Sequence, residues 1–208
     1  MAVTQCSLFD AGESARPRTP GSAAPREWLD GGAWVEFESH WLGGSAHLFD
    51  RLLGEVPWRA ERRRMYDRTV DVPRLVAFYR EEDPLPDPVL VEVRDSLCRM
   101  YKDERAAPFS TAGICLYRTG DDSVAWHGDR IGRRSHDETL VAIVSLGAPR
   151  RLLLRPKGGG QGRRFSLGHG DLLVMGGTCQ RTWEHSVPKT ARAAGPRISV
   201  QFRSAGAG

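Results

Sequence analysis

Two His-x-Asp pairs are the parts of this sequence whose residue types and spacing could hold a metal ion. The first is His127-Gly128-Asp129 and the second is His169-Gly170-Asp171. On an extended strand, residues i and i+2 point to the same side, so the imidazole and the carboxylate of one pair could face the same ion. The pattern also arises by chance, so it predicts a metal site only together with further ligands.

The first pair is the better candidate, and His185 could supply a third ligand. His169 lies between Gly168 and Gly170, where a turn is expected and the same-side argument fails, so we interpret it as a loop residue. Two histidines and one carboxylate on one face of a metal suit a non-haem Fe(II) enzyme, because they leave positions open for oxygen and a co-substrate. The alternative is that three unrelated polar residues occur in this order.

The segment Arg197–Arg203 is predicted to be a strand with two faces. Arg197 and Arg203 share one face, and the opposite, core-facing side carries three apolar residues, Ile198, Val200 and Phe202. On a straight strand the two arginine backbones lie roughly 20 Å apart, which is too far for both to clamp one carboxylate. They could instead converge on the two ends of a dicarboxylic acid, or they could flank a solvent-exposed face.

Two helices are predicted in the first half of the chain, after a short strand-like run around Trp34 to Glu38. Ser45 can cap the first helix, which stops before Pro57 and carries apolar residues at helical spacing, Leu48, Leu52, Leu53 and Val56. Asp87 can cap the second helix, in which Pro88 occupies the first turn and an apolar stripe extends to about Lys102.

From residue 111 onward, short apolar runs separated by Gly, Pro and Asp predict a β-rich core. The runs are Ile114–Tyr117, Thr139–Leu146, Leu152–Leu154, Leu172–Met175 and Ile198–Phe202. Helices followed by many short strands predict a mainly β (α+β) fold, a double-stranded β-helix (jelly roll) with the N-terminal helices packed on one sheet. We expect a disordered tail over residues 1–26, which are rich in Pro, Gly and Ser, and one domain over residues 27–208.

Composition and charge narrow the class of protein. No stretch approaches the ~18 apolar residues of a membrane span and the N-terminus lacks a secretory pattern, so we expect a cytoplasmic protein with no membrane partner. The 4 cysteines form no C-x-x-C pair, so neither a zinc cluster nor a disulfide framework is indicated. Nearly all of the 30 basic residues are arginine, which suits phosphate binding or reflects a general compositional bias, and the net charge of +4 does not decide between the two.

Four segments together resemble the AlkB family of alkylation-repair dioxygenases. They are Leu116-Tyr117-Arg118 followed by Gly120 and His127, the turn and strand His169–Met175, the stretch Trp183–Pro188, and the segment Pro196–Arg203. The similarity covers about residues 56–203 and includes Pro73–Tyr79, which is similar to the family's lid over the substrate. It implies helices and a nucleotide-recognition lid within residues 27–105 and a catalytic jelly roll within residues 106–204.

The resemblance implies a set of site residues. Those that would bind Fe(II) are His127, Asp129 and His185, and those that would hold 2-oxoglutarate are Tyr117, Arg197 and Arg203. Our candidates for the substrate surface are the arginines Arg62–Arg64 and Arg74, interleaved with the aromatic residues Tyr66, Phe78 and Tyr79. Trp126, next to the first ligand, is a further candidate. The alternative for this last group is a solvated helix face and ordinary core aromatics.

Two positions depart from the family pattern. Many members carry an asparagine two residues before the tyrosine, whereas this chain has Cys115, which puts one polar contact to the co-substrate in doubt. Members that act on adenine and cytosine lesions often carry an acidic residue four positions after the first ligand, where this chain has Ile131. The lesion preference is therefore left open.

The resemblance implies oxidative removal of alkyl groups from bases such as 1-methyladenine or 3-methylcytosine. The reaction would convert 2-oxoglutarate to succinate and release formaldehyde. A base inside a duplex cannot reach a buried iron, so a monomer is expected to act on single-stranded or flipped-base nucleic acid, with DNA preferred to RNA. Two alternatives stay open: an oxygenase with a protein or small-molecule substrate, and a non-catalytic nucleic-acid-binding barrel.

Overall fold

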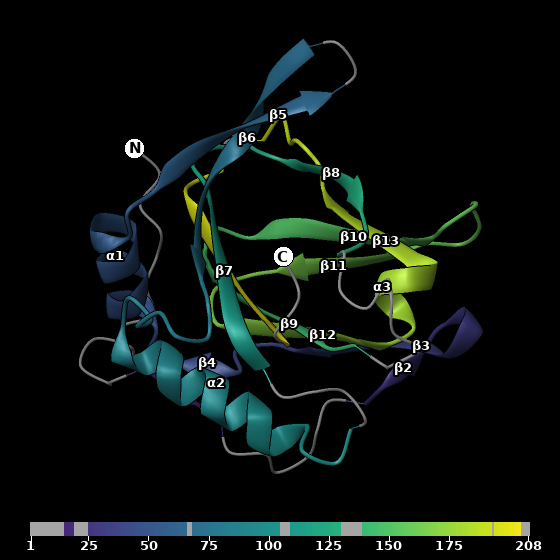
Figure 1. The fold of residues 1–208 in the computed structure, drawn as a ribbon, viewed down its shortest axis with the longest axis horizontal. Coiled ribbons are helices and arrows are strands. Elements are labelled where there is room, and N and C mark those ends of the chain that lie inside the picture. The colour runs from purple at the N-terminus through teal and green to yellow at the C-terminus, as the bar shows by residue number, and fades with distance from the viewer. Residues whose placement is uncertain are drawn as a thin grey trace.

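A computed structural model describes residues 15–18, 25–65, 68–104, 109–129, 139–192 and 194–204, and it describes the backbone alone for residues 62–65 and 68–71. Within these ranges two antiparallel sheets face each other, and two helices lie outside the larger sheet (Figure 1). The predicted mainly β jelly roll, with N-terminal helices packed on one sheet, is confirmed.

The larger sheet has eight strands in the order β2-β3-β12-β9-β14-β7-β6-β5. Their bounds, in this order, are Glu27–Trp28, Ala33–Glu38, Asp171–Gly177, Val141–Gly147, Arg197–Ser204, Phe109–Tyr117, Arg68–Tyr79 and Arg59–Met65. Every residue of β9 and β12 is buried, because the helices cover one face of the sheet and the second sheet covers the other. This double coverage explains why these two strands read as continuous apolar runs in the sequence.

The smaller sheet has four strands in the order β11-β10-β13-β8. Their bounds are Arg163–Leu167, Arg150–Pro156, Trp183–Val187 and Val124–His127. Leu152, Leu154 and Leu167 pack against β9 and β12 and form a core between the two sheets. The edge strand β8 pairs with β13, and this pairing places His127 opposite His185.

Helices α1 (Ala46–Glu55) and α2 (Pro88–Met100) form a second core on the outer face of the large sheet. The predicted cap of α2 is confirmed, because the Asp87 side chain accepts a hydrogen bond from the backbone N–H of Val89. Ser45 occupies the N-cap position of α1 as predicted, but its side chain does not cap the helix: the hydroxyl donates to the Leu42 carbonyl oxygen and contacts the His169 ring instead. The stretch between β12 and β13 holds the short helix α3 (Cys179–Thr182).

Part of the predicted disordered tail is structured. Strand β1 (Arg16–Pro17) pairs with β4 (Leu42–Gly43), and Ala15 is buried beside it. Arg26 forms ion pairs with Glu36 and Glu104 and lies over the ring of Trp34. Backbone pairing and these charged contacts stabilise segments whose apolar content is low. The remainder of the predicted tail lies outside the described residues.

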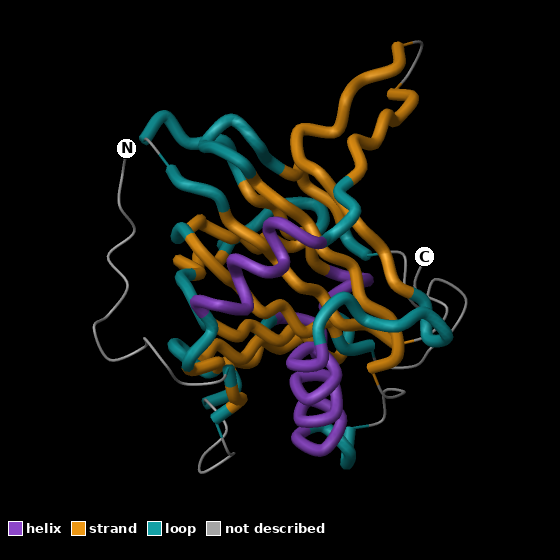
Figure 2. The backbone as a smooth tube through the Cα atoms, turned by 90° about the vertical axis from the view of Figure 1, so that its left-hand side faces the viewer, coloured by secondary structure: helices purple, strands orange, loops and turns teal. Residues whose placement is uncertain are grey.

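Strands β5 and β6 form a long hairpin that projects beyond the rest of the large sheet (Figures 1 and 2). Sequence patterns did not indicate these strands, since the arginine-rich β5 lacks apolar alternation. The predicted lid segment, residues 73–79, is the part of β6 nearest to β7, with which residues 75–79 pair. Its predicted neighbour Tyr66 lies outside the described residues.

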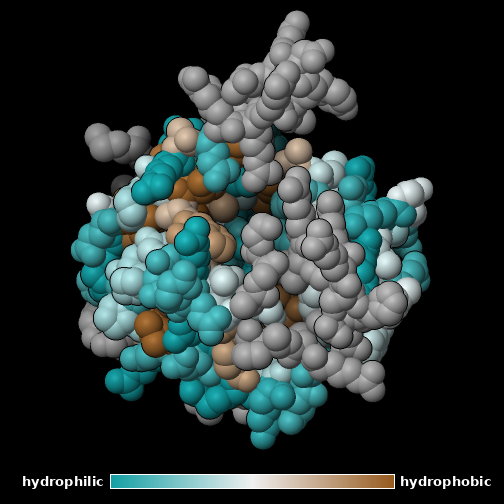
Figure 3. Space-filling view, viewed as in Figure 1, coloured by the Kyte–Doolittle hydropathy of each residue, from teal (hydrophilic) through white to brown (hydrophobic). Residues whose placement is uncertain are grey.

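Most of the described surface on the face seen in Figure 3 is hydrophilic, with small separate hydrophobic areas. The exposed large hydrophobic side chains among the described residues are Trp28, Phe78 and Val91. None of the described helices is both long enough and apolar enough to cross a membrane.

Candidate metal centre

Two strands of the small sheet and the loop after one of them bring together the three predicted metal ligands. His127 ends β8, Asp129 follows it, and His185 lies on β13 directly opposite His127. One ligand atom from each residue lies within 4.8 Å of the other two, and the two histidine ring centroids are 4.2 Å apart. Two imidazoles and one carboxylate in this arrangement suit Fe(II) with open coordination positions.

Asp129 reaches the metal centre from a loop and not from the strand that the sequence suggested. Strand β8 stops at His127, and the chain then passes close under α3. A Cβ atom on Gly128 would lie 2.7 Å from the Gln180 carbonyl oxygen, so glycine permits this approach. The Gln180 side chain in turn accepts a hydrogen bond from the backbone N–H of Asp129 at 3.1 Å and so fixes the loop.

The protonation states of Asp129 and His185 are those that metal ligands need. Burial alone would raise the pKa of Asp129, but Arg203 and the two histidines outweigh it and lower the pKa to about 2. Burial, and then the neighbouring His127, lower the pKa of His185 to about 3. The Nδ1 atom of His127 lies 2.9 Å from the Ala125 carbonyl oxygen, so Nδ1 carries the hydrogen and Nε2 remains available to a metal.

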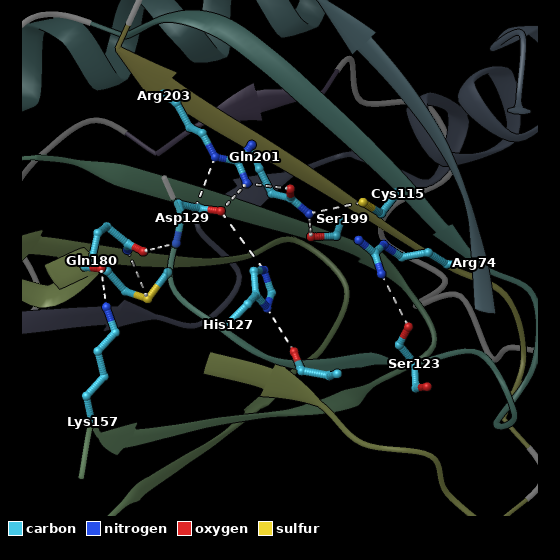
Figure 4. A network of polar contacts seen from close by, with 12 residues as sticks. Arg74, Cys115, Ser123, His127, Asp129, Lys157, Gln180, Ser199, Gln201 and Arg203 are labelled. Atoms are coloured by element: carbon cyan, nitrogen blue, oxygen red, sulfur yellow. Dashed lines mark hydrogen bonds and ion pairs between the residues drawn. The ribbon is translucent and has the colours of Figure 1, made fainter. Parts of the chain in front are cut away.

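The inner face of β14 connects the metal centre to the predicted 2-oxoglutarate site. Arg203 donates to both carboxylate oxygens of Asp129, from Nε at 3.0 Å and Nη2 at 3.3 Å. Gln201 accepts from Arg203 at 2.9 Å and donates to the Ser199 hydroxyl at 3.0 Å (Figure 4). Our sequence analysis missed Ser199 and Gln201, although the alternation that placed both arginines on this face places these two residues there as well.

At the far end of this face, Arg197 has the properties of a carboxylate-binding residue. It is 1% exposed, its Nε donates to the Ser145 hydroxyl at 2.9 Å, and its Nη1 has no hydrogen-bond partner among the described residues. Its guanidinium carbon lies 5.2 Å from the centroid of the Tyr117 ring. Burial lowers the pKa of Arg197 and raises that of Tyr117 to about 12. A buried cation with an unused donor fits an anionic ligand, so the solvent-face alternative is wrong.

The structure separates two of the predicted substrate contacts from the metal centre. Tyr79 packs against the core under the helices, on the opposite face of the large sheet. Trp126 is adjacent to His127 in sequence but faces outward, with the Arg155 guanidinium 4.1 Å from its ring centroid. Arg74, the third candidate, does point between the sheets (Figure 4). The side chains of Arg62–Arg64 and the departure at Ile131 lie outside the described residues.

Residues 43–203 match the model of the 2OG-Fe(II) oxygenase superfamily, where 2OG is 2-oxoglutarate. The chain belongs to this superfamily. The match confirms Fe(II) and 2-oxoglutarate as its cofactors, and the residues present fit both: the metal centre supplies the ligand set, and Arg197 supplies an unpaired buried cation.

Several curated relatives are named as AlkB homologues, in agreement with the resemblance. The chain is 30% identical over 180 residues to alpha-ketoglutarate-dependent dioxygenase alkB homolog 3 from Bos taurus, covering 76% of this chain and 60% of the relative. It is 28% identical over 214 residues to DNA oxidative demethylase ALKBH2 from Arabidopsis thaliana, covering 82% and 63%. The chain thus spans about 60% of the length of these relatives.

A solved structure of OsALKBH1 has the same fold. It superposes with a TM-score of 0.60 at 15% identity and covers 86% of this chain and 100% of that one. A prolyl hydroxylase from Trichoplax adhaerens, solved with a peptide fragment of hypoxia inducible factor, also has a TM-score of 0.60, at 11% identity and with coverage of 82% and 83%. At these identities the likeness extends to the fold alone.

Proposed function

We propose that this protein removes alkyl groups oxidatively from nucleic-acid bases such as 1-methyladenine or 3-methylcytosine, converting 2-oxoglutarate to succinate and releasing formaldehyde. The observation that carries the proposal is that the three candidate metal ligands converge, and that Arg203, which holds Asp129, shares one face of β14 with the buried Arg197. The names of the curated relatives, AlkB homologues and a DNA oxidative demethylase, support a nucleic-acid substrate. When bound, Fe(II) and 2-oxoglutarate supply the oxidation of the alkyl carbon by molecular oxygen.

The residues of this chain have distinct tasks in that reaction. Arg203 and Gln180 hold Asp129 from two directions, and the Ala125 carbonyl orients His127, so the metal centre is preorganised. Arg197 and Tyr117 bind the carboxylate of 2-oxoglutarate that is distant from the metal. The span of β14 between Arg203 and Arg197 separates the two ends of the co-substrate site.

Phe78 is the residue that we assign to the substrate base. It is 51% exposed, and it lies on the inner face of β6 opposite Gly113. A Cβ atom on Gly113 would lie 2.9 Å from Arg203 Nη1 and 4.0 Å from the Phe78 ring, so the absence of a side chain brings the ring next to the arginine that holds Asp129. Aromatic faces bind unpaired bases by stacking, which suits a single-stranded or flipped base.

DNA is the expected nucleic acid, RNA is the second candidate, and the projecting hairpin β5–β6 is the surface that we expect to contact the phosphates (Figure 1). The arginine run in β5 supports this assignment, because guanidinium groups bind phosphate through paired donors. A monomer acting in the cytoplasm stays a prediction.

The function is tested by product analysis with methylated oligonucleotides. Fe(II) and 2-oxoglutarate are added to the protein without oxygen, air is admitted, and mass spectrometry follows the loss of a methyl group from single-stranded DNA, duplex DNA and RNA. We expect demethylation that His127→Ala abolishes and that Phe78→Ala slows mainly through a higher KM for the oligonucleotide, while 2-oxoglutarate affinity is unchanged. If succinate forms while every oligonucleotide stays methylated, the oxygenase activity stands and the nucleic-acid substrate is wrong.

A further inference from the structure

Arg74 of β6 has a buried nitrogen that neither the core nor the metal centre uses. Its Nη1 donates to the Ser123 carbonyl oxygen over a long 3.4 Å, but its Nε is shielded from solvent and makes no hydrogen bond within the described part of the chain. A buried donor that stays unpaired costs more free energy than a typical hydrogen bond gains, especially on a charged group. This nitrogen therefore indicates a missing acceptor.

The position of Arg74 shows where that acceptor would lie. Leu75 pairs with Leu116, so the next residue pair along the two strands is Arg74 and Tyr117, both on the inner face of the large sheet. On the other side of β7, Arg197 of β14 also pairs with Tyr117. Arg74 and Arg197 therefore lie on the two strands that flank Tyr117. Figure 4 shows the Arg74 side chain extending between the sheets toward Cys115 and Ser199. Two guanidinium groups with one unpaired nitrogen each thus flank one tyrosine.

The charges around Tyr117 also require an anion. Arg150 lies over the same ring at 5.5 Å, but its nitrogens already donate to the carbonyl oxygens of Thr119, Asp122 and Pro188. Burial alone would lower the pKa of Arg74, but Cys115, Tyr117 and, with the smallest effect, the carboxylate of Glu61 outweigh it and raise the pKa. Burial raises the pKa of Tyr117 to about 12, so its phenol is neutral near neutral pH and does not compensate the positive charges of Arg74 and Arg197.

We propose that Arg74 binds the distal carboxylate of 2-oxoglutarate together with Arg197, the two guanidinium groups approaching it from opposite sides of Tyr117. This assigns Arg74 to the co-substrate and not to the nucleic acid for which its sequence context made it a candidate. The inference rests on the oxygenase part of the proposed function and is independent of which substrate is oxidised.

The test measures ligand binding and needs no turnover. Isothermal titration of the protein with Mn(II) in place of Fe(II) gives the Kd of 2-oxoglutarate, and competition gives the Kd of 2-oxopentanoate, which has the same chain length but lacks the distal carboxylate. We expect Arg74→Gln to weaken 2-oxoglutarate about 10- to 100-fold, the range for one charged hydrogen-bond partner, and to leave 2-oxopentanoate unchanged. Arg74→Lys, which keeps the charge, should weaken 2-oxoglutarate less.

Arg155→Gln is the matched control, because it removes the same charge from the outer face, where Arg155 contacts Trp126 and Glu184. It should leave both dissociation constants unchanged. Equal weakening of both ligands by Arg74→Gln would show that Arg74 supports the fold or the metal end, and the proposal would be wrong. Unchanged 2-oxoglutarate binding with weaker oligonucleotide binding would instead return Arg74 to the nucleic acid. If Arg74→Gln does not fold, as judged by its melting curve, the same two-ligand comparison on Arg74→Lys decides.

Discussion

The two His-Gly-Asp segments of this chain have the same sequence and opposite roles. At the second segment, both ring nitrogens of His169 are occupied: Nδ1 accepts from the backbone N–H of Gly147 at 2.9 Å, and Nε2 lies 2.8 Å from the Ser45 hydroxyl. The two oxygens of Asp171 accept from the backbone N–H groups of His40 and Gly168 at 2.9 and 2.7 Å. This segment fastens a turn to α1 and β9, and neither ring nitrogen of His169 is left for a metal.

At the first segment the same side chains converge on a shared space. Nε2 of His127 points toward Asp129, at 4.0 Å from Oδ1, and His185 adds a third ligand from the neighbouring strand. The carboxylate of Asp129 is bound by a side chain, Arg203, and not by the backbone. The motif alone therefore does not define a metal centre, because the partners of its ring nitrogens and carboxylate oxygens decide which atoms can bind a metal.

Asp129→Asn should have the largest effect on function. It removes the negative charge that would pair with both a divalent metal and Arg203. The new amide N–H group can also point at the Arg203 guanidinium, which does not accept hydrogen bonds. We expect metal affinity to fall by more than the roughly 10- to 100-fold that loss of an outer-shell partner causes, and the melting temperature to fall as well, because the largely buried Arg203 loses its ion-pair partner. Titration with Mn(II) measures the first quantity and circular dichroism the second. A variant that still bound Mn(II) like the parent would remove Asp129 from the metal centre.

His169→Ala should lower stability and leave the metal centre unchanged. It leaves the Gly147 N–H without an acceptor, and a buried donor without a partner costs about 1–3 kcal/mol, whereas the Ser45 hydroxyl keeps its hydrogen bond to the Leu42 carbonyl oxygen. In a chain of this size each kcal/mol lowers the melting temperature by about 2–4 °C. Metal affinity should remain that of the parent. Loss of Mn(II) binding without a lower melting temperature would contradict the structural role of the second segment.

Gly128→Ala should have the smallest effect of these three substitutions. The added Cβ atom would lie 2.7 Å from the backbone oxygen of Gln180, so α3 and the loop that carries Asp129 must move apart. We expect metal affinity to fall about tenfold, similar to the lower range for outer-shell changes. The matched control is Gly54→Ala in α1, where nothing lies within 4 Å of the new Cβ and alanine favours the helix. Unaltered Mn(II) affinity in Gly128→Ala would show that the loop adapts without cost.

Sequence reasoning succeeded where a pattern is local. Helix α2 follows from a cap, a proline and an apolar stripe within one stretch, and β14 follows from alternation within seven residues. Strand β5 escaped prediction because its arginines show no alternation, and its partner in the sheet provides the missing stabilisation. The N-cap position of Ser45 was predicted correctly, but the partners of its hydroxyl were not, because one of them, His169, lies far along the chain.

The residues of the candidate site also divide into those that a local pattern predicts and those that act through contacts with distant residues. Spacing and residue type were enough to select the three residues that could hold a metal and both arginines of β14. Gln180 and Ser145 could not be found, because each is functional through a contact with a residue about 50 positions away, Asp129 and Arg197 respectively. The outward orientation of Trp126 and the position of Tyr79 under the helices depend on which face each strand presents, which single residues in a short strand do not reveal.

The place of β14 between β7 and β9 has a consequence for biosynthesis. Both neighbours are made first, yet neither pairs with the other, and the sheet closes only when residues 197–204 have left the ribosome and inserted between them. Until then the nascent chain carries two uncovered strand edges, which are open to aggregation. The same late strand carries Arg197 and Arg203, so the emerging polypeptide acquires these two arginines and its finished sheet in a single step.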